Sequence, residues 1–175
     1  NEAFADVVNW DLLPPNAIAS MQLLPGSNPV FGLNTLGGAL ALSMKNGFRS
    51  PGIVAEAYGG SFGRAFAGAS AGGSGGSLAG FVAGEALYDR GWLDHSQTRI
   101  ARMYARTDWH GGPSDANLAV TAGDSRLNGT QALPQSMLGE PRQPYTWPDT
   151  TENRLGFVSG TVRRRLPNDN LVAAN

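Results

Sequence analysis

Apolar and polar positions alternate with a period of two along much of the chain. In RAFAGASAG, residues 64–72, alanines at the odd positions alternate with arginine, phenylalanine, glycine and serine. SLAGFVAGEALYD, residues 77–89, places leucine, valine, alanine and tyrosine on one side, with Phe81 and Glu85 opposite. A period of two is that of a β-strand whose faces meet different surroundings. Because GGSGG, residues 72–76, lies between the runs, we predict a β-hairpin.

A second pair of alternating runs follows the first. TRIARMYARTDW, residues 98–109, has two faces: Ala101, Met103, Ala105 and Trp109 on one, and Arg102, Tyr104, Arg106 and Asp108 on the other. In ANLAVTAGDSR, residues 116–126, leucine, valine and alanine alternate with asparagine, threonine and serine. GGPSD, residues 111–115, consists of residues that favour turns. The sequence therefore predicts a second hairpin.

The end of the chain continues this organisation after a long interruption. Residues 127–151 contain four prolines and no alternation, which predicts a long loop. ENRLGFVSGTVRRRL, residues 152–166, predicts another strand, PND predicts a turn, and NLVAAN predicts the beginning of a further strand. Because the chain has no initiator Met and stops in this strand, we interpret it as a piece of a longer protein.

Two all-β architectures fit such strands of about ten residues, joined by short turns at one end and longer loops at the other. A transmembrane β-barrel places small apolar residues toward lipid and polar residues toward a wet lumen. A soluble β-sandwich or a Gly-rich secreted passenger gives the same alternation, so alternation alone leaves these alternatives open. The polar face of residues 98–109 needs water, and Trp109 suits an interfacial aromatic girdle, which both favour the barrel.

Composition and charge narrow the functional classes. The formal net charge of -1 argues against a nucleic-acid partner, because such a surface carries excess Lys and Arg. The absence of cysteine excludes disulfides and thiolate metal sites. His95 and His110 have no ligand-type partner at a metal-binding spacing, so we interpret them as surface residues. No catalytic arrangement is evident, and we therefore predict a protein that is not an enzyme and carries no cofactor or metal.

The stretch before the alternating runs carries a set of spaced motifs. LPPNAIASMQLLPGSNPVFGLNTLGGALALSMKNGF, residues 13–48, contains a short apolar run ending at Gly26, then Phe31-Gly32, then the pair Gly37-Gly38 and a closing run that ends at Lys45. This order resembles the second half of the plug domain of TonB-dependent outer-membrane receptors. Those plugs have a strand ending in Arg-Gly-Pro, a Tyr-Gly or Phe-Gly turn, and a Gly-Gly pair opening a last strand that ends in Thr-Lys.

The sequence departs from the family pattern at three positions. Gln22 stands where the family usually has Glu, Pro25 where it has Arg, and Ser27 where it has Pro. In the family, that Glu and Arg help to seat the plug against the barrel wall. The departures therefore remove the basis for carrying this ion pair over to the present chain.

The resemblance implies a mainly β fold with two parts. Residues 1–50 would be the C-terminal part of the plug domain, and residues 51–175 the first antiparallel strands of a transmembrane β-barrel of about 22 strands. The plug motif residues would be Gly26, Phe31, Gly32, Gly37, Gly38 and Lys45. Ligand-binding residues are not identified by the motif.

The resemblance also implies a function and its setting. The protein would lie in the outer membrane of a Gram-negative bacterium, in contact with its lipid. It would take up a scarce nutrient, such as a ferric siderophore or other metal chelate, using energy delivered by TonB and its inner-membrane complex. The alternatives are a passive porin-like channel, which lacks a plug, and a soluble Gly-rich adhesin or passenger.

The Gly-Gly pair has a physical explanation under this interpretation. A plug strand inside a barrel approaches other backbone closely, and only glycine allows that approach or a positive φ without steric cost. We therefore expect Gly37 and Gly38 to be close-contact positions.

Overall fold

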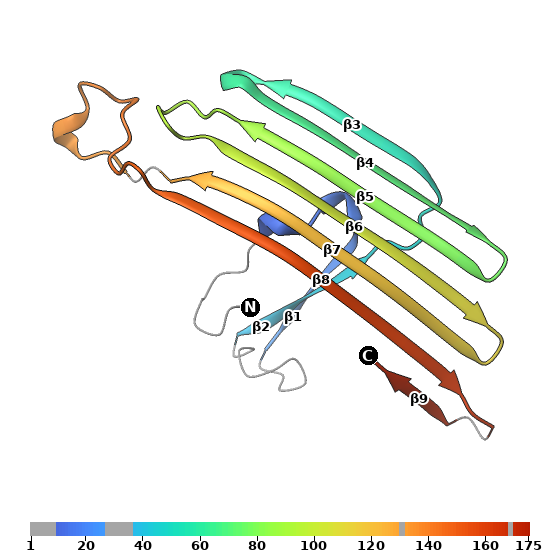
Figure 1. The fold of residues 1–175 in the computed structure, drawn as a ribbon. Coiled ribbons are helices and arrows are strands. Elements are labelled where there is room, and N and C mark those ends of the chain that lie inside the picture. Colours follow the sequence, from blue (N-terminus) through green and yellow to red (C-terminus); the bar gives the residue numbers. More distant parts are fainter. Residues whose placement is uncertain (1–9, 27–36, 130–131, 168–169) are drawn as a thin grey trace.

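The computed structural model of the chain describes residues 10–26, 37–129, 132–167 and 170–175 (Figure 1). The structure is mainly β, as the alternation predicts. Seven strands form one sheet in which each strand pairs antiparallel with its neighbours in the sequence. The strands are β3 (Gly52–Gly60), β4 (Arg64–Gly75), β5 (Leu78–Asp89), β6 (Thr98–Gly111), β7 (Ser114–Asn128), β8 (Thr150–Arg165) and β9 (Leu171–Ala174).

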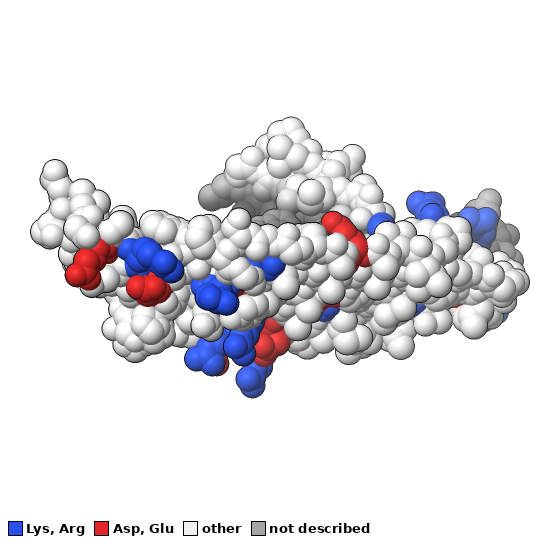
Figure 2. Space-filling view, turned by 90° about the horizontal axis from the view of Figure 1, so that it is seen from above, with Lys and Arg blue, Asp and Glu red and all other residues white. Residues whose placement is uncertain are grey.

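The described residues before β3 form a separate small unit. β1 (Ile18–Pro25) and β2 (Gly38–Met44) pair antiparallel in a two-stranded sheet. Two 3-10 turns precede them, η1 (Trp10–Leu12) and η2 (Pro15–Ala17). This unit lies behind the seven-stranded sheet in Figure 1 and projects from one side of it in Figure 2. We call residues 10–26 and 37–51 the N-terminal segment.

The predicted strands are confirmed; β4, β6, β7 and β8 extend beyond the predicted bounds, β4 into the predicted turn 72–76, whereas β5 and β9 lie within their predicted bounds. β4 and β5 have 12 residues each and β8 has 16, so they exceed the predicted length of about ten. The predicted loop at residues 127–151 is shortened at both ends, because β7 continues to Asn128 and β8 begins at Thr150. Within it, Gln135–Met137 form the 3-10 turn η5. β3 was not predicted as a strand.

The connections differ at the two ends of the sheet. At one end, β4 passes to β5 and β6 to β7 through two-residue turns, and Gly76 and Gly112 have positive φ there. At the other end lie residues 90–97 and the long connection 129–149. The link from β3 to β4 is an exception at this end, because it consists only of the 3-10 turn η4 (Ser61–Gly63). We call this end the loop end and the opposite end the turn end.

The register of the strands separates two faces. One row of opposed residues crosses five strands and consists of Ser70, Ala83, Tyr104, Thr121 and Phe157. The N-terminal segment packs on the face that carries this row, which we call the inner face. The opposite, outer face carries Val82, Ala105, Val120 and Val158 in one row. The assignments of residues to faces made from the sequence are therefore confirmed.

The sheet formed by the described residues is open. β3 and β9 are its two edges, and no closed barrel is formed by the described residues. None of the helices that the structure describes is long and apolar enough to cross a membrane.

Candidate functional site between the N-terminal segment and the sheet

The N-terminal segment is joined to the sheet by a small apolar core on the inner face. Ala17, at the end of η2, has no exposed surface and packs with Phe81, Ala83, Tyr104 and Ala119. Met44, the last residue of β2, packs against the same cluster. Small residues at positions 17, 83 and 119 let the backbone of η2 come close to the strands. The core therefore lies between the two units.

Asn16 attaches η2 to two neighbouring strands at once. Its Nδ2 donates to the carbonyl oxygen of Ala69 at 3.2 Å and to that of Gly84 at 3.1 Å. Ala69 and Gly84 are opposite one another in β4 and β5. An amide NH2 group has two donors, and both are therefore used on the backbone of the sheet. A side chain at position 16 that lacks these donors cannot form the hydrogen bonds to Ala69 and Gly84.

A charged pair on the inner face holds the first turn of the segment. Glu85 and Arg102 are opposed in β5 and β6, and Arg102 Nε donates to Glu85 Oε1 at 2.6 Å. Arg102 Nη1 also donates to the backbone oxygens of Trp10 and Asp11, at 3.2 and 2.9 Å. Only 8% of the surface of Glu85 is exposed, so its charge depends on this partner. The guanidinium thus links the sheet to η1 and neutralises a buried carboxylate.

A second polar pair lies beside the first on the same face. Arg106 Nε donates to both carboxylate oxygens of Asp108 at 2.9 Å, and Asp108 is buried. Both residues belong to β6, two positions apart. The inner face therefore carries paired charges where the outer face carries alanine and methionine. This arrangement satisfies charges without exposing them to an apolar medium.

Glycines allow the closest approach of the segment to the sheet. A Cβ at Gly47 would lie within 3.0 Å of the oxygens of Gly73 and Gly80 and the nitrogen of Gly80. A Cβ at Gly72 would collide with the carbonyl oxygen of Ser50. At Gly123 a Cβ would lie 3.1 Å from the oxygen of Leu12. Both partners of the interface therefore contribute glycines where backbone meets backbone.

A cavity of about 470 Å³ remains between η2 and the strands β3 to β6. Its lining includes Glu56, Tyr58, Arg64, Glu85 and Arg102. Tyr58 and Phe66 stack at its side with ring centroids 4.8 Å apart. The cavity is large enough for a small polar ligand, and both charge signs are present in its walls. No group of three or more His, Cys, Asp or Glu able to hold a metal is found among the described residues.

Of the six residues predicted from the plug motif, the four that the structure describes lie in or beside the small hairpin, and none of these four makes the closest contacts with the sheet. Gly26 follows β1 with φ +95°, and Gly38 opens β2 with φ +145°. A Cβ at Gly38 would lie 2.8 Å from the oxygen of Leu24, within the hairpin. Lys45 follows β2, and its N–H donates to the oxygen of Ala17 at 2.8 Å. Phe31 and Gly32 lie outside the described residues.

The close contact expected at Gly37 is a correction to the sequence analysis. No described atom lies within 4 Å of a Cβ built at Gly37, and its φ is outside the left-handed region. The expectation is confirmed at Gly38 only in part, because its close neighbour belongs to β1 and not to the sheet. Gly47 has the role that was assigned to the pair. It is the second-last residue of the same quoted stretch, within Lys-Asn-Gly, but no local signal distinguishes it from Gly37.

The outer face consists of an apolar band bordered by charges. Exposed apolar side chains cover it: Ile53, Leu78, Val82, Met103, Trp109, Leu118, Val120, Val158, Val162 and Val172. On β6 the band runs from Ala101 to Trp109, which is about 26 Å at roughly 3.3 Å per residue. In the rows of opposed residues from Met103 to Trp109, the outer positions of β4 to β8 carry no charged residue, whereas the row of Ala101 contains Asp124 and Arg154.

The charges that border the band lie mainly toward the loop end. Arg154 Nε donates to Asp124 at 2.9 Å, and Arg126 pairs with Glu152 at 3.4 Å. Figure 2 shows a group of basic and acidic side chains projecting from the side of the sheet opposite the N-terminal segment. The rest of that side is mostly uncharged. Monomeric soluble proteins rarely expose a continuous apolar area of this extent. The outer face therefore requires an apolar partner.

No protein-family model matches the chain, and no curated protein sequence matches it significantly. The family resemblance of residues 13–48 therefore stays a prediction.

Proposed function

We propose that the chain is part of a TonB-dependent outer-membrane receptor that imports a scarce nutrient. Residues 1–50 form the C-terminal part of its plug, and residues 51–175 form the first strands of its barrel. The observation that carries this proposal is the polarity of the sheet. Its outer face is apolar and exposed, whereas its inner face carries buried charged pairs and is partly covered by the N-terminal segment.

The polarity differs from that of a soluble sheet with one wet face. In a soluble protein the covered face is apolar and the exposed face is polar. Here Val158 is 64% exposed on the outer face, and Glu85 is buried on the inner face. A lipid bilayer supplies an apolar partner for the outer face. A wet lumen containing a plug supplies polar partners for the inner face. The apolar band of about 26 Å on β6 agrees with the roughly 25 Å band of outer-membrane barrels.

The connections support the same orientation. Outer-membrane barrels have short periplasmic turns and longer extracellular loops. The turn end of the sheet would therefore face the periplasm, and residues 129–149 at the loop end would face outward. In the complete protein, the open edges at β3 and β9 would pair with further strands of a barrel of about 22 strands.

The mechanism assigns a role to the contacts beneath the sheet. In the resting protein, Asn16, Arg102 and the Gly47 approach hold the plug against the wall and close the lumen. TonB, energised by its inner-membrane complex, would pull on the plug and break these contacts. A small nutrient, such as a metal chelate, would then pass. Transport in this proposal depends on the difference in free energy between the docked and the undocked state of the plug. No catalysis is involved.

The alternatives differ from this proposal in one feature each. A passive porin-like channel needs an inner face open to water, but here η1, η2 and β2 cover part of that face. A soluble Gly-rich adhesin needs a partner that covers the whole outer face of the sheet in water. Neither accounts for both faces together, whereas a plugged barrel does.

A reversible tether between plug and wall tests the proposal. Leu12 and Gly123 are chosen for a disulfide because a Cβ at position 123 would lie 3.3 Å from the Cα of Leu12, and its 3.1 Å contact with the oxygen of Leu12 requires a shift of a few tenths of an ångström. The chain itself contains no cysteine, so it adds no competing thiol. The complete receptor with Leu12→Cys and Gly123→Cys would be compared with each single variant in a deletion strain. Growth on iron chelates and sugars first identifies the nutrient.

The expected result is loss of energy-dependent uptake in the oxidised double variant, at normal outer-membrane abundance, with recovery after addition of a reductant. Each single variant should transport in either condition. Unchanged uptake by the tethered protein would contradict a moving plug. Uptake that persists without the proton gradient would indicate a passive channel.

A further inference from the structure

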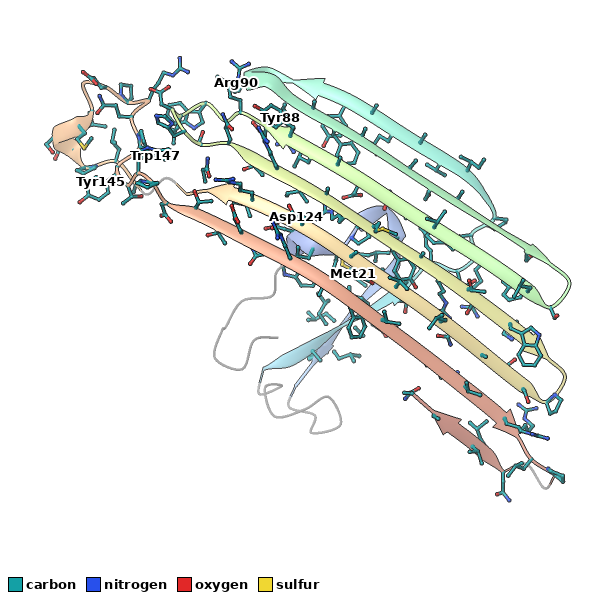
Figure 3. The ribbon with its side chains drawn as sticks, viewed as in Figure 1. Met21, Tyr88, Arg90, Asp124, Tyr145 and Trp147 are labelled. Atoms are coloured by element: carbon teal, nitrogen blue, oxygen red, sulfur yellow. The ribbon has the colours of Figure 1, made fainter. Side chains whose placement is uncertain are left out.

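A second cavity lies at the loop end, on the outer face, outside the interface described above. It has a volume of about 280 Å³ and is lined by His95, Gln97, Arg99, Arg126, Asn128 and Trp147. Arg99 lies at the start of β6, and Arg126 and Asn128 lie at the end of β7. Gln97 directly precedes β6. His95 and Trp147 belong to the two connections at the loop end. Figure 3 shows Tyr88 and Trp147 near this end of the sheet.

Two arginines oppose one another at the base of this cavity. Arg99 of β6 and Arg126 of β7 are direct cross-strand partners. Like charges in this position destabilise a sheet unless an opposite charge lies between or beside them. Tyr88 and Glu152 complete the row on either side, opposite Arg99 and Arg126 respectively.

The neighbouring residues compensate only part of this positive charge. Glu152 lies 3.4 Å from Arg126 Nε, and both side chains of the pair are more than half exposed. The guanidinium of Arg99 lies 5.5 Å from the centroid of the Tyr88 ring and forms no ion pair with the described residues. Asp124, the nearest other carboxylate on β7 of this face, is already paired with Arg154. Among the ion pairs of the described residues, Glu152 is therefore the one carboxylate that pairs with either of these two guanidinium groups.

The walls add neutral hydrogen-bonding groups and a stacked ring pair. The rings of His95 and Trp147 stack with centroids 4.2 Å apart and connect the two loops. Asn128 Oδ1 accepts from Thr150 Oγ1 at 3.0 Å, which leaves the amide nitrogen of Asn128 as a donor. The lining therefore consists mainly of donors, with two forked guanidinium groups that match the oxygens of an oxyanion.

We propose that this cavity binds a phosphate group, held between Arg99 and Arg126. Phosphate fits because each guanidinium can donate two parallel hydrogen bonds to it, and its charge removes the repulsion between the arginines. The group could belong to a lipid at the border of the apolar band or to a small soluble molecule. The proposal rests on the strand register and the cavity, so it does not depend on the plug or on transport.

Binding would be measured on the complete protein in neutral detergent. One titration uses inorganic phosphate, and the other uses a phosphorylated glucosamine lipid in mixed micelles, with the dephosphorylated lipid as its control. The variant Arg99→Gln/Arg126→Gln should weaken binding at least tenfold. Arg154→Gln, which changes an arginine of the same face outside the cavity, should leave it within twofold.

A gain of affinity provides a test that misfolding cannot imitate. Glu152→Gln removes the competing carboxylate, so phosphate binding should become several-fold tighter. Preference for the phosphorylated lipid would identify a lipid headgroup, and equal binding of inorganic phosphate would identify a soluble ligand; both outcomes support the site. Absence of saturable binding of both probes would overturn it. Equal weakening by Arg154→Gln, or no gain in Glu152→Gln, would do the same.

Discussion

Gly47 is the position at which one added carbon should most change how the N-terminal segment sits on the sheet. In Gly47→Ala, the new Cβ would meet two carbonyl oxygens and one nitrogen of Gly73 and Gly80, all within 3.0 Å. These are backbone atoms of paired strands, which cannot rotate away as the end of a side chain can. Because φ of Gly47 is outside the left-handed region, the effect comes from contact alone. The segment must therefore lift from the strands.

The expected cost follows from this overlap. Forcing an extra carbon into a packed contact costs about 1–3 kcal/mol. A change of that size corresponds to a factor of roughly 5 to 150 in an equilibrium constant. The Ala17 amide reports on docking, because Ala17 has no exposed surface where it packs on Phe81, Ala83 and Tyr104 of the sheet. We expect its hydrogen exchange to become faster by such a factor in the complete protein, while amides in the middle of β6 and β7 keep their rates.

Gly37→Ala is the matched control for this experiment. It makes the same chemical change in the same segment, but no described atom lies within 4 Å of the added Cβ. Its exchange profile should equal that of the wild type. If Gly47→Ala and Gly37→Ala behave alike, the backbone approach at Gly47 does not hold the segment, and the reasoning from the glycine contacts is wrong.

Three further predictions concern the interface and the long loop. Asn16→Asp replaces the two donors by a carboxylate facing the oxygens of Ala69 and Gly84, which should cost about 1–3 kcal/mol and speed exchange of Ala17, whereas unchanged exchange would contradict the contact. Arg102→Met leaves Glu85 buried without its partner and should lower the free energy of unfolding by about 3–5 kcal/mol in denaturant titrations; adding Glu85→Met should recover most of it, and additive losses would refute the pairing. Trypsin added to intact cells should cut after the exposed Arg142 in the 129–149 connection, and cutting only after the outer membrane is opened would reverse the assigned orientation.

The strands that the sequence predicted are those whose two faces differ chemically. In β6, alternate positions are arginine or tyrosine on one side and alanine or methionine on the other, so the period of two is visible without a structure. β3 was missed because GIVAEAYGG is short, begins and ends with glycine, and alternates weakly between Glu56 or Tyr58 and alanine. Its position depends on pairing with β4, which supplies partners for all nine of its residues.

The interface could be predicted only in part, because its contacts join residues that are distant in the chain. The sequence placed Arg102 and Glu85 on the polar sides of their strands, but their opposition depends on the register of β5 and β6. Asn16 lies 53 residues from Ala69 and 68 from Gly84, and nothing local indicates that its amide reaches them. Gly37 and Gly47 look alike in sequence, and only the approach of Gly73 and Gly80 distinguishes them.

The central claim is that the outer face of the sheet contacts lipid while the inner face does not. Val158 and Ser159 are adjacent in β8, both exposed, and point to opposite faces. Val158 lies in the middle row of the apolar band, where an arginine should cost about 2–4 kcal/mol in a bilayer.

The most direct measurement compares the amount of folded protein in the outer membrane for Val158→Arg and Ser159→Arg of the complete protein, expressed at equal levels. The account predicts that Val158→Arg strongly reduces assembly and that Ser159→Arg assembles nearly as the wild type does. Equal assembly of the two variants, or folding of both in water without detergent, would contradict a lipid-facing outer surface.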